Sequence, residues 1–529
     1  MDYGYGMRPL PAAPLALAAS FAFGGCGPST TPNAMPDATP PDTDAAHVSP
    51  DGAPPPDATR PPPAGYFEAL ALPHAVDRNP DPHIIEVDIS AGPAHAELLP
   101  GKTTALWTYN GTMPGPLIEA NVGDRLIMHF TNRLPEDTIV HAHGVRTPNP
   151  MDGSAMTQAT IPEGGTFDYD YVLPDAGLFW YHPHQRSNVQ LARGLYGAIL
   201  VHDPAEPPAL GDADEAVVVL DDIMLEDDGR LAPDDDGGAL GDIFGREGNI
   251  LLVNGRVHPT VPVRAGRPLR WRVLNAAGAR YFEVDLAGQT AWLVGTDGGL
   301  LEHPVPITSL LLEPASRADV IIVPTAHPGT DVELRWMPFD RGYLTGNRDP
   351  EPLMSLHVVD GPDNVPERHA PPAADLRTIA PILDTGAATP HETLVLGEKA
   401  VGEGLQLTFN DVPYPPGLEL HTPTDTTAIW TLDNQTDGGH PFHLHGFFFQ
   451  VLDVAGVPPA YRSWRDTFHI PPHTVVRLGI PFDGREGVWM FHCHILDHAE
   501  IGMMGHVHTD APVPTDLRAP RAPPAPPAP

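Results

Sequence analysis

Short apolar segments separated by turn residues recur along most of this chain, and this pattern constrains the fold more than any other feature. Gly, Pro, Asn and Asp interrupt the segments about every 8–15 residues, a spacing typical of β-sandwiches. Only "SNVQLARGL" at residues 187–195 could form a short helix, and long amphipathic helices are absent from the pattern. The pattern therefore predicts an all-β protein. Examples of the segments are "HIIEVDIS", "DRLIMHFTN", "AVVVLDDIML", "PLRWRVLNA" and "VVRLGIPF".

Two polar, proline-rich stretches divide the strand-rich region, at residues 202–215 and 360–375. The parts between them each have the size of one sandwich. The chain is 529 residues long, which allows several domains of roughly 100–200 residues each. We therefore expect three consecutive β-sandwich domains, at residues 80–204, 212–361 and 375–511.

The two ends of the chain have a different composition. Residues 27–65 are mostly Pro, Ala, Asp and Thr with almost no large apolar residue, and the C-terminus reads "APRAPPAPPAP". Segments so poor in large apolar side chains cannot bury enough surface to order themselves. We expect a Pro-rich N-terminal linker over residues 27–79 and a disordered C-terminal tail over residues 512–529.

The N-terminal segment, residues 1–26, has the features of an export signal. A basic residue precedes an apolar run, and Gly24 and Gly25 stand directly before Cys26. This arrangement resembles a bacterial lipoprotein signal, in which the cysteine receives a lipid. An unlipidated secretory signal is the alternative, and both interpretations export the protein. We expect a periplasmic or outer-membrane-anchored lipoprotein, attached to the membrane through a lipid on Cys26, or alternatively a secreted protein.

Charge and cysteine content narrow the function further. Acidic residues outnumber basic ones by 68 to 30, and no basic face of the kind that nucleic-acid binding needs is visible. The chain has two cysteines, so if Cys26 carries a lipid, no structural disulfide can form. Cys493 would then be a free thiol in an oxidising compartment, and metal ligation is one reason for such a thiol.

Four short segments each carry a pair of histidines in an HxH arrangement. On a strand the side chains of residues i and i+2 share one face, so both imidazoles of a pair can hold one metal ion or two neighbouring ions. A single pair is weak support for a metal site, but four pairs in one chain are hard to obtain by chance. Imidazoles gathered in this number would also repel one another when protonated, unless a metal holds them neutral. The pairs are His141 and His143, His182 and His184, His443 and His445, and His492 and His494.

The C-terminal segment "HCHILDHAEIGMM" adds a thiol to the imidazoles. A blue-copper site consists of two His, one Cys thiolate and a weak axial Met. Cys493, His498 and Met503 have the spacing of a turn that folds back on one metal ion, and His440 is the candidate for the second imidazole. Ordinary core packing is the alternative for Met503, and we expect it for the neighbouring Met504.

These segments, in this order, closely resemble the copper-binding signatures of bacterial three-domain, laccase-like multicopper oxidases. The resemblance covers about residues 80–511 and includes "YNGTMPGP", "PNPMDG", "DAGLFWYHPH", "GLYGAILVHD" and "HPFHLHGFFFQVL". It implies three cupredoxin domains, each a Greek-key β-sandwich, in agreement with the strand pattern. It also implies four copper ions, namely one type 1 ion, one type 2 ion and a type 3 pair.

The resemblance assigns all copper ligands, and no ligand position is substituted. The type 1 copper would be held by His440, Cys493, His498 and Met503. The type 2 copper would be held by His141 and His443. The type 3 pair would be held by His143, His182, His184, His445, His492 and His494. The trinuclear cluster would lie between the first and third domains, with the middle domain as a spacer and a wall of the substrate approach.

The implied activity is the one-electron oxidation of a reducing substrate, repeated four times and coupled to the reduction of O₂ to water. Electrons would enter at the type 1 copper, where the imidazole of His498 or His440 would lie near the surface. They would leave through Cys493, whose neighbours His492 and His494 hold type 3 ions. The HCH tripeptide would thus form a short covalent path between two metal sites.

Oxygen reduction also needs protons. Asp152, in "PNPMDG", resembles an acid that the family places near the trinuclear cluster, where it would orient water or a ligand imidazole. A cap of the Met-Asp-Gly turn is the alternative. In related bacterial enzymes a second acid often follows the last type 1 histidine, but this position is Ala499 here. Whether Glu500, one residue further on, replaces that acid stays open.

The sequence gives weaker indications of the substrate than of the metal ligands. Some relatives oxidise phenols and aromatic amines, whereas others oxidise cuprous ion, which a Met-rich segment over the type 1 site favours. The 13 Met of this chain are scattered, and Met151, Met156, Met337 and Met354 stand alone. We therefore expect a monomeric laccase-like oxidase of phenols or aromatic amines with O₂ as acceptor. A cuprous oxidase is the alternative, and a non-catalytic cupredoxin-like scaffold is disfavoured because every ligand position is filled.

Overall fold

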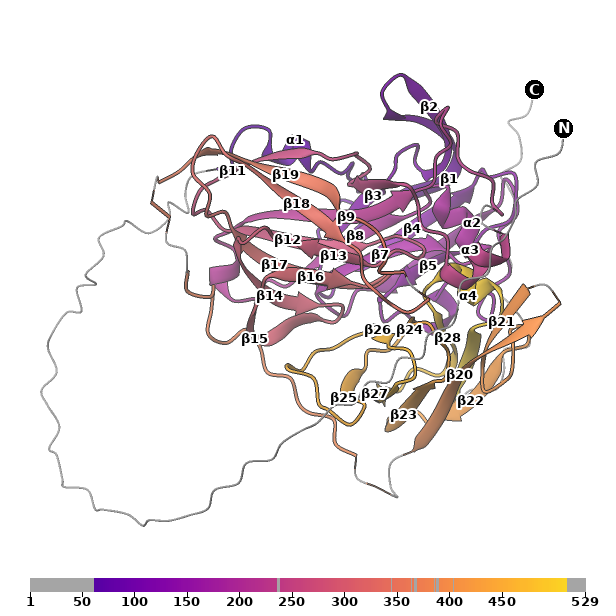
Figure 1. The fold of residues 1–529 in the computed structure, drawn as a ribbon. Helices are drawn as coiled ribbons and strands as arrows, with labels where there is room; N and C mark the ends of the chain where they lie inside the picture. Colours follow the sequence, from indigo (N-terminus) through magenta and orange to yellow (C-terminus); the bar gives the residue numbers. More distant parts are fainter. Residues whose placement is uncertain are drawn as a thin grey trace, which may run out of the picture. The chain divides into compact units, whose positions relative to one another are not determined.

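The computed structural model describes residues 61–510, apart from residues 236–237, 344, 363, 366–368, 385, 387–389 and 403. Strands dominate this part of the chain and form six sheets (Figure 1). The prediction of an all-β protein is therefore confirmed. The expected export signal with Cys26, the linker up to residue 60 and the C-terminal tail lie outside the described residues.

The first domain is a sandwich of two four-stranded sheets, with the orders β2-β1-β4-β6 and β3-β8-β7-β5. Apolar and polar positions alternate along its strands, as in β4, where Leu126, Met128 and Phe130 are buried between more exposed neighbours. The strands are β1 (Ile84–Leu99), β2 (Lys102–Tyr109), β3 (Gly115–Asn121), β4 (Arg125–Asn132), β5 (Val140–His143), β6 (Thr166–Val172), β7 (Gly177–Pro183) and β8 (Gly197–His202).

The second domain pairs a six-stranded sheet, β10-β9-β12-β17-β14-β15, with a five-stranded sheet, β11-β19-β18-β13-β16. Strands β12 and β17 are buried at every position. The strands are β9 (Asp214–Ile223), β10 (Ile250–Val253), β11 (Thr260–Arg264), β12 (Leu269–Asn275), β13 (Phe282–Asp285), β14 (Thr290–Thr296), β15 (Gly299–Ile307), β16 (Ser309–Leu312), β17 (Arg317–Val323), β18 (Asp331–Met337) and β19 (Glu351–Asp360).

An apolar core joins the first and second domains. Trp180 and Leu200 of the first domain pack in one buried cluster with Val219 and Leu274 of the second. Strand β9 therefore has apolar neighbours on both of its faces. This explains why it reads as a run of apolar residues, "AVVVL", rather than as an alternation of apolar and polar residues. The first and second domains are therefore held together by side-chain packing.

The third domain consists of two five-stranded sheets, with the orders β21-β20-β23-β27-β25 and β22-β29-β28-β24-β26. Its strands are coloured orange to yellow in Figure 1. The strands are β20 (His391–Val401), β21 (Gly404–Phe409), β22 (Leu418–Thr422), β23 (Thr426–Asn434), β24 (His440–Leu444), β25 (Gln450–Val454), β26 (Thr467–Ile470), β27 (Val475–Phe482), β28 (Gly487–Cys493) and β29 (Met504–Thr509).

The helices are short. The expected helix after residue 187 is present as α2 (Ser187–Ala192), and it contacts α4 (Leu496–Glu500) of the third domain, which in turn contacts α3 (Gly238–Phe244) of the second. The remaining helices are α1 (Tyr66–Ala69) and the 3₁₀ turns η1 (Asn149–Met151) and η2 (Pro208–Leu210). None of the helices in the described ranges has the length and apolar character needed to cross a membrane.

Helix α1 lies in the stretch expected to be a linker, yet it is ordered. Tyr66 is fully buried, and its hydroxyl donates a hydrogen bond of 3.0 Å to the carbonyl of Asp214 and accepts one of 3.2 Å from Trp271 Nε1. Tyr66, with Leu70 in the same apolar cluster, thus fixes the end of the linker to the second domain. The exact boundaries of the three domains stay predictions of the sequence.

Candidate metal centres

Strand pairing places the HxH histidines side by side within each domain. In the first domain β5 and β7 are antiparallel neighbours, with His141 opposite His182. In the third domain β24 and β28 are antiparallel neighbours, with His443 opposite His492. His184, His445 and His494 directly follow the ends of β7, β24 and β28, so each pair of strands and its first following residues bring four imidazoles together.

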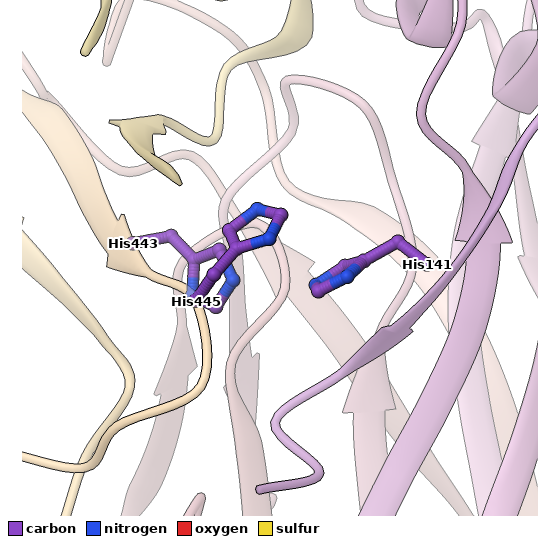
Figure 2. Close-up of side chains that lie close together, drawn as sticks. All are labelled: His141, His443 and His445. Atoms are coloured by element: carbon purple, nitrogen blue, oxygen red, sulfur yellow. The ribbon is translucent and has the colours of Figure 1, made fainter. Parts of the chain in front are cut away.

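The two sets of imidazoles face each other between the first and third domains. The rings of His141 and His445 stack with centroids 3.9 Å apart, and those of His143 and His443 with centroids 3.8 Å apart. Figure 2 shows His141 of β5 reaching toward His443 and His445 from the third domain. All eight imidazoles are buried, so the structure brings together the histidines that the sequence singled out.

Hydrogen bonds at one ring nitrogen leave the other nitrogen bare. His141 Nδ1 donates to the backbone carbonyl of Asp152 over 2.6 Å, and His443 Nδ1 donates to that of Asp466 over 2.9 Å. The Nε2 atom of each ring is buried and has no hydrogen-bond partner among the described residues. His182 repeats this arrangement, with Nδ1 donating to the Pro183 carbonyl over 3.0 Å and Nε2 bare.

His143 has the opposite orientation. Its Nε2 donates to a carboxylate oxygen of Asp466 over 3.2 Å, and its Nδ1 is buried with no partner in the described part of the chain. Both nitrogens of His494 are buried without such a partner as well. The contact with Asp466 thus leaves Nδ1 as the nitrogen that His143 offers to a ligand.

Three further Nε2 atoms point at one another. His492 Nε2 lies 3.4 Å from His184 Nε2 and 3.2 Å from His445 Nε2. The Nδ1 atoms of His492 and His445 already face oxygen acceptors at 2.9 Å, in Cys493 and Asp152. Lone pairs that converge in this way repel one another unless a cation lies between them.

Burial keeps these imidazoles in the form that binds metals. It lowers the pKa of His184 to about 3 and that of His492 to about 4, and it lowers the pKa of the other six well below the usual value. A neutral imidazole is the metal-ligating form. Neutral, buried imidazoles with bare nitrogens are a donor set that copper accepts.

A separate group in the third domain combines two imidazoles with the thiol. His440 Nδ1 and His498 Nδ1 are 3.1 Å apart, and Cys493 Sγ lies 3.6 Å from each of them. Burial raises the pKa of the Cys493 thiol to about 12, so a thiolate there needs a neighbouring cation. Two imidazoles and a thiolate on one point are the donors of a blue-copper site.

Met503 follows helix α4 in the chain and is tied to this group through its backbone. Its N–H donates to the carbonyl of His498 over 3.0 Å, and its carbonyl accepts a hydrogen bond of 3.1 Å from the N–H of Cys493. Its side chain is fully buried in the same apolar cluster as Cys493. The connection between β28 and β29 thus folds back on the thiol, with a short helix where a simple turn was expected.

The two imidazoles of this group are fully buried, contrary to the expectation that one would lie near the surface. His498 Nε2 donates a hydrogen bond of 2.9 Å to the carbonyl of Ile243, in helix α3 of the second domain. His440 Nε2 lies 2.8 Å from the hydroxyl of Thr436. Helix α3 therefore covers the outer edge of the His498 ring.

Asp152 lies beside the eight imidazoles, where the sequence placed an acid. Its carboxylate oxygens are 2.9 and 3.1 Å from His445 Nδ1, and its backbone carbonyl accepts the hydrogen bond from His141 Nδ1. Burial raises the pKa of this carboxyl. Asp152 thus orients one imidazole from each of two domains.

Asp466 is a residue that the sequence did not single out. Its carboxylate faces His143, and it accepts hydrogen bonds of 2.7 and 2.5 Å from the guanidinium of Arg317, a buried residue of the second domain. The N–H of Arg317 in turn donates to Asp297 over 2.8 Å. The second domain holds none of the proposed ligands, but it supplies the cation that compensates this carboxylate.

Glu500 joins two domains. Its carboxylate accepts hydrogen bonds of 2.8 and 2.9 Å from the N–H and the hydroxyl of Ser187, at the start of α2. Ala499 is buried against Met490 and Met504. In this arrangement Glu500 holds α4 against the first domain.

Comparisons with known proteins agree with this geometry. Three family models described as "Multicopper oxidase" match residues 91–206, 214–330 and 389–512. The chain is 30% identical to a multicopper oxidase of Mycobacterium tuberculosis over 79% of this chain and 86% of that protein. It is also 30% identical to a laccase of Bacillus subtilis over 78% of this chain and 90% of that protein. A solved multicopper oxidase of Campylobacter jejuni, described as a metallo-oxidase, superposes with a TM-score of 0.73 at 28% identity and covers 83% of this chain and 94% of that chain.

The fold and the donor groups define a copper oxidoreductase built from cupredoxin-like domains. The chain belongs to the multicopper oxidase family. The resemblance noted in the sequence is therefore confirmed, and the protein is an enzyme that uses oxygen.

Proposed function

We propose that this chain holds four copper ions and couples the oxidation of phenols or aromatic amines to the reduction of O₂ to water. The observation that carries this proposal is the buried group of eight imidazoles from two domains, whose bare nitrogens converge. Bound copper would supply one-electron redox chemistry at these residues. Residues 1–26 support the further proposal that the protein is exported.

The ligands divide into three sets. A type 1 ion would be held by His440, Cys493, His498 and Met503. A type 2 ion would be held by His141 and His443. A type 3 pair would be held by His143, His182, His184, His445, His492 and His494. Groups of three donor atoms within 4.8 Å of one another support these sets, among them His440, Cys493 and His498, and His184, His445 and His492.

The protein's own contribution is to fix the imidazoles. Asp152 fixes His445, and the Asp466–Arg317 pair keeps a charged acceptor against His143 Nε2. Each such contact prevents the ring from turning its bare nitrogen away from the group. Cys493 links the two donor groups covalently, because His492 and His494 are its chain neighbours.

A cavity beside α4 supports the proposal that the substrates are aromatic. It has a volume of about 340 Å³ and is lined by residues of all three domains, including Leu191, Phe244 and Leu496. Leu496 lies two residues before His498, so the cavity adjoins the proposed electron entry. Met224 is the only methionine among its described lining residues, which suits an aromatic ring better than Cu(I).

Oxygen consumption by the copper-loaded enzyme tests whether phenols are better substrates than Cu(I). With a methoxyphenol as reductant we expect four one-electron oxidations for each O₂ consumed, and water as the product. We also expect a larger kcat/KM for the phenol than for Cu(I). A larger kcat/KM for Cu(I) would make the cuprous oxidase the correct function, and release of hydrogen peroxide would contradict the proposed trinuclear group.

Replacing Asp152 by asparagine should impair the enzyme while leaving its fold intact. The amide keeps the size of the side chain but presents no charged acceptor to His445 Nδ1, so we expect turnover to fall about 10–100-fold. The matched control is Asp168→Asn, because Asp168 faces His129 at 2.8 Å in the same domain but outside the copper ligands. Turnover per bound copper should be unchanged in that control, and equal losses in both variants would argue against the role of Asp152.

A further inference from the structure

A second group of histidines lies on the third domain, apart from the proposed copper ligands. Edge strand β22 pairs in parallel with β29, with Glu419 beside His506 and His421 beside His508. These four positions alternate with the core residues of the two strands, so all four side chains lie on the outer face of the sheet. The sequence pattern ExH on one strand and HxH on the next thus gathers one carboxylate and three imidazoles.

The four side chains are close together. The rings of His421 and His508 stack with centroids 4.8 Å apart, and the rings of His506 and His508 have centroids 5.1 Å apart. A carboxylate oxygen of Glu419 lies 3.0 Å from His421 Nε2 and 3.4 Å from His508 Nε2. Imidazoles from both strands therefore lie around one carboxylate oxygen of Glu419.

The inner half of this group is buried and carries bare nitrogens. His506 and His508 are 7% and 2% exposed, and the Nδ1 atom of each has no hydrogen-bond partner in the described part of the chain. Burial lowers the pKa of both rings, which favours the neutral form. Buried polar atoms without partners are rare in native proteins, so these two nitrogens call for a ligand.

The outer half of the group is open to solvent. The side chains of His421 and Glu419 are 69% and 51% exposed. The contact between Glu419 and His421 satisfies the carboxylate, but it leaves His506 Nδ1 and both nitrogens of His508 without a hydrogen-bond partner among the described residues. A cation that enters from the solvent side can bind the carboxylate and the imidazoles together.

We propose that Glu419, His421, His506 and His508 form a site for a divalent transition-metal ion of the Zn(II) or Cu(II) type, which fastens edge strand β22 to β29. Imidazole and carboxylate donors suit these ions, whereas Ca²⁺ and Mg²⁺ prefer oxygen ligands alone. The site lies on the opposite face of β29 from the domain core, to which Leu420 and Val507 belong.

Equilibrium dialysis of the copper-loaded enzyme against Zn(II), with metal analysis by mass spectrometry, tests the proposal. We expect one zinc ion per chain without loss of copper, and a melting temperature that rises with zinc. His421→Ala should weaken zinc binding by at least about tenfold and remove the shift in melting temperature. Because His421 is largely exposed, this variant should keep the fold, which its visible copper absorption can verify.

The matched control is His473→Ala. His473 is also exposed, lies in the same domain and faces the carboxylate of Asp437 at 2.8 Å, but it has no second histidine in this arrangement. Zinc binding should be unchanged in this variant. The proposal is overturned if the wild-type enzyme binds no zinc, or if His421→Ala and His473→Ala bind zinc equally well.

Discussion

Replacing Cys493 by serine should abolish both the visible absorption and the turnover of the copper-loaded enzyme. The thiol sulfur lies 3.6 Å from the Nδ1 atoms of His440 and His498, where a thiolate would bind the same ion as the two imidazoles. An intense visible band of such a site arises from charge transfer between thiolate and copper, which a serine hydroxyl cannot supply. Absorption spectroscopy and oxygen consumption of the same sample measure both losses, and we expect each to fall to background.

Met503→Leu separates this effect from a general disturbance of the site. The methionine is expected to be a weak axial ligand, so leucine should keep the visible band and shift the redox potential. A Cys493→Ser variant that kept its turnover would show that electrons enter the protein elsewhere.

Replacing Arg317 by methionine should destabilise the protein by about 3–5 kcal/mol, because it would leave buried carboxylates without their counter-charge. The guanidinium is fully buried, donates to Asp466 over 2.7 and 2.5 Å and lies 3.6 Å from a carboxylate oxygen of Asp297. The midpoint of urea denaturation, followed by tryptophan fluorescence, measures this change. We also expect lower copper occupancy, because Asp466 contacts His143.

Arg125→Met is the control for this substitution. Arg125 also binds an aspartate, Asp170, through two hydrogen bonds of 2.7 and 2.6 Å, but its side chain is 49% exposed. An exposed ion pair of this kind contributes about 0–1 kcal/mol. If both variants lost the same stability, burial would not be the reason for the importance of Arg317.

The fold class and the donor residues could be predicted because their signals are local. Side chains on a strand return to the same face every two residues. The two imidazoles of an HxH pair such as His141 and His143 are therefore predicted to lie on one face. The short distance between Cys493 and His498 likewise limits where the two side chains can lie. The resemblance to the multicopper oxidases then implied that the eight imidazoles meet between the first and third domains. It did not give their ring orientations.

The contacts that fix these rings could not be predicted, because they join distant parts of the chain. Arg317 and Asp466 are 149 residues apart and lie in different domains. His498 Nε2 in the same way donates its hydrogen bond to the carbonyl of Ile243, 255 residues away. No local pattern marks such partners, since each is an ordinary residue until the domains pack together.

The ordering of Tyr66 illustrates the same limit at the end of the linker. Composition alone predicts a disordered stretch, because the residues before it are small and polar. Tyr66 packs against Trp271, and Leu70 and Leu72 are buried further along the same segment. Composition does not report such fits.

Diffraction from copper-loaded crystals at the copper absorption edge tests the central proposal most directly. Four anomalous peaks are predicted in the described ligand groups. One should lie among His440, Cys493 and His498, and three should lie within the eight imidazoles between the first and third domains. An empty Cys493 group, or fewer than three peaks among the eight imidazoles of the fully loaded enzyme, would contradict the proposed ligand sets.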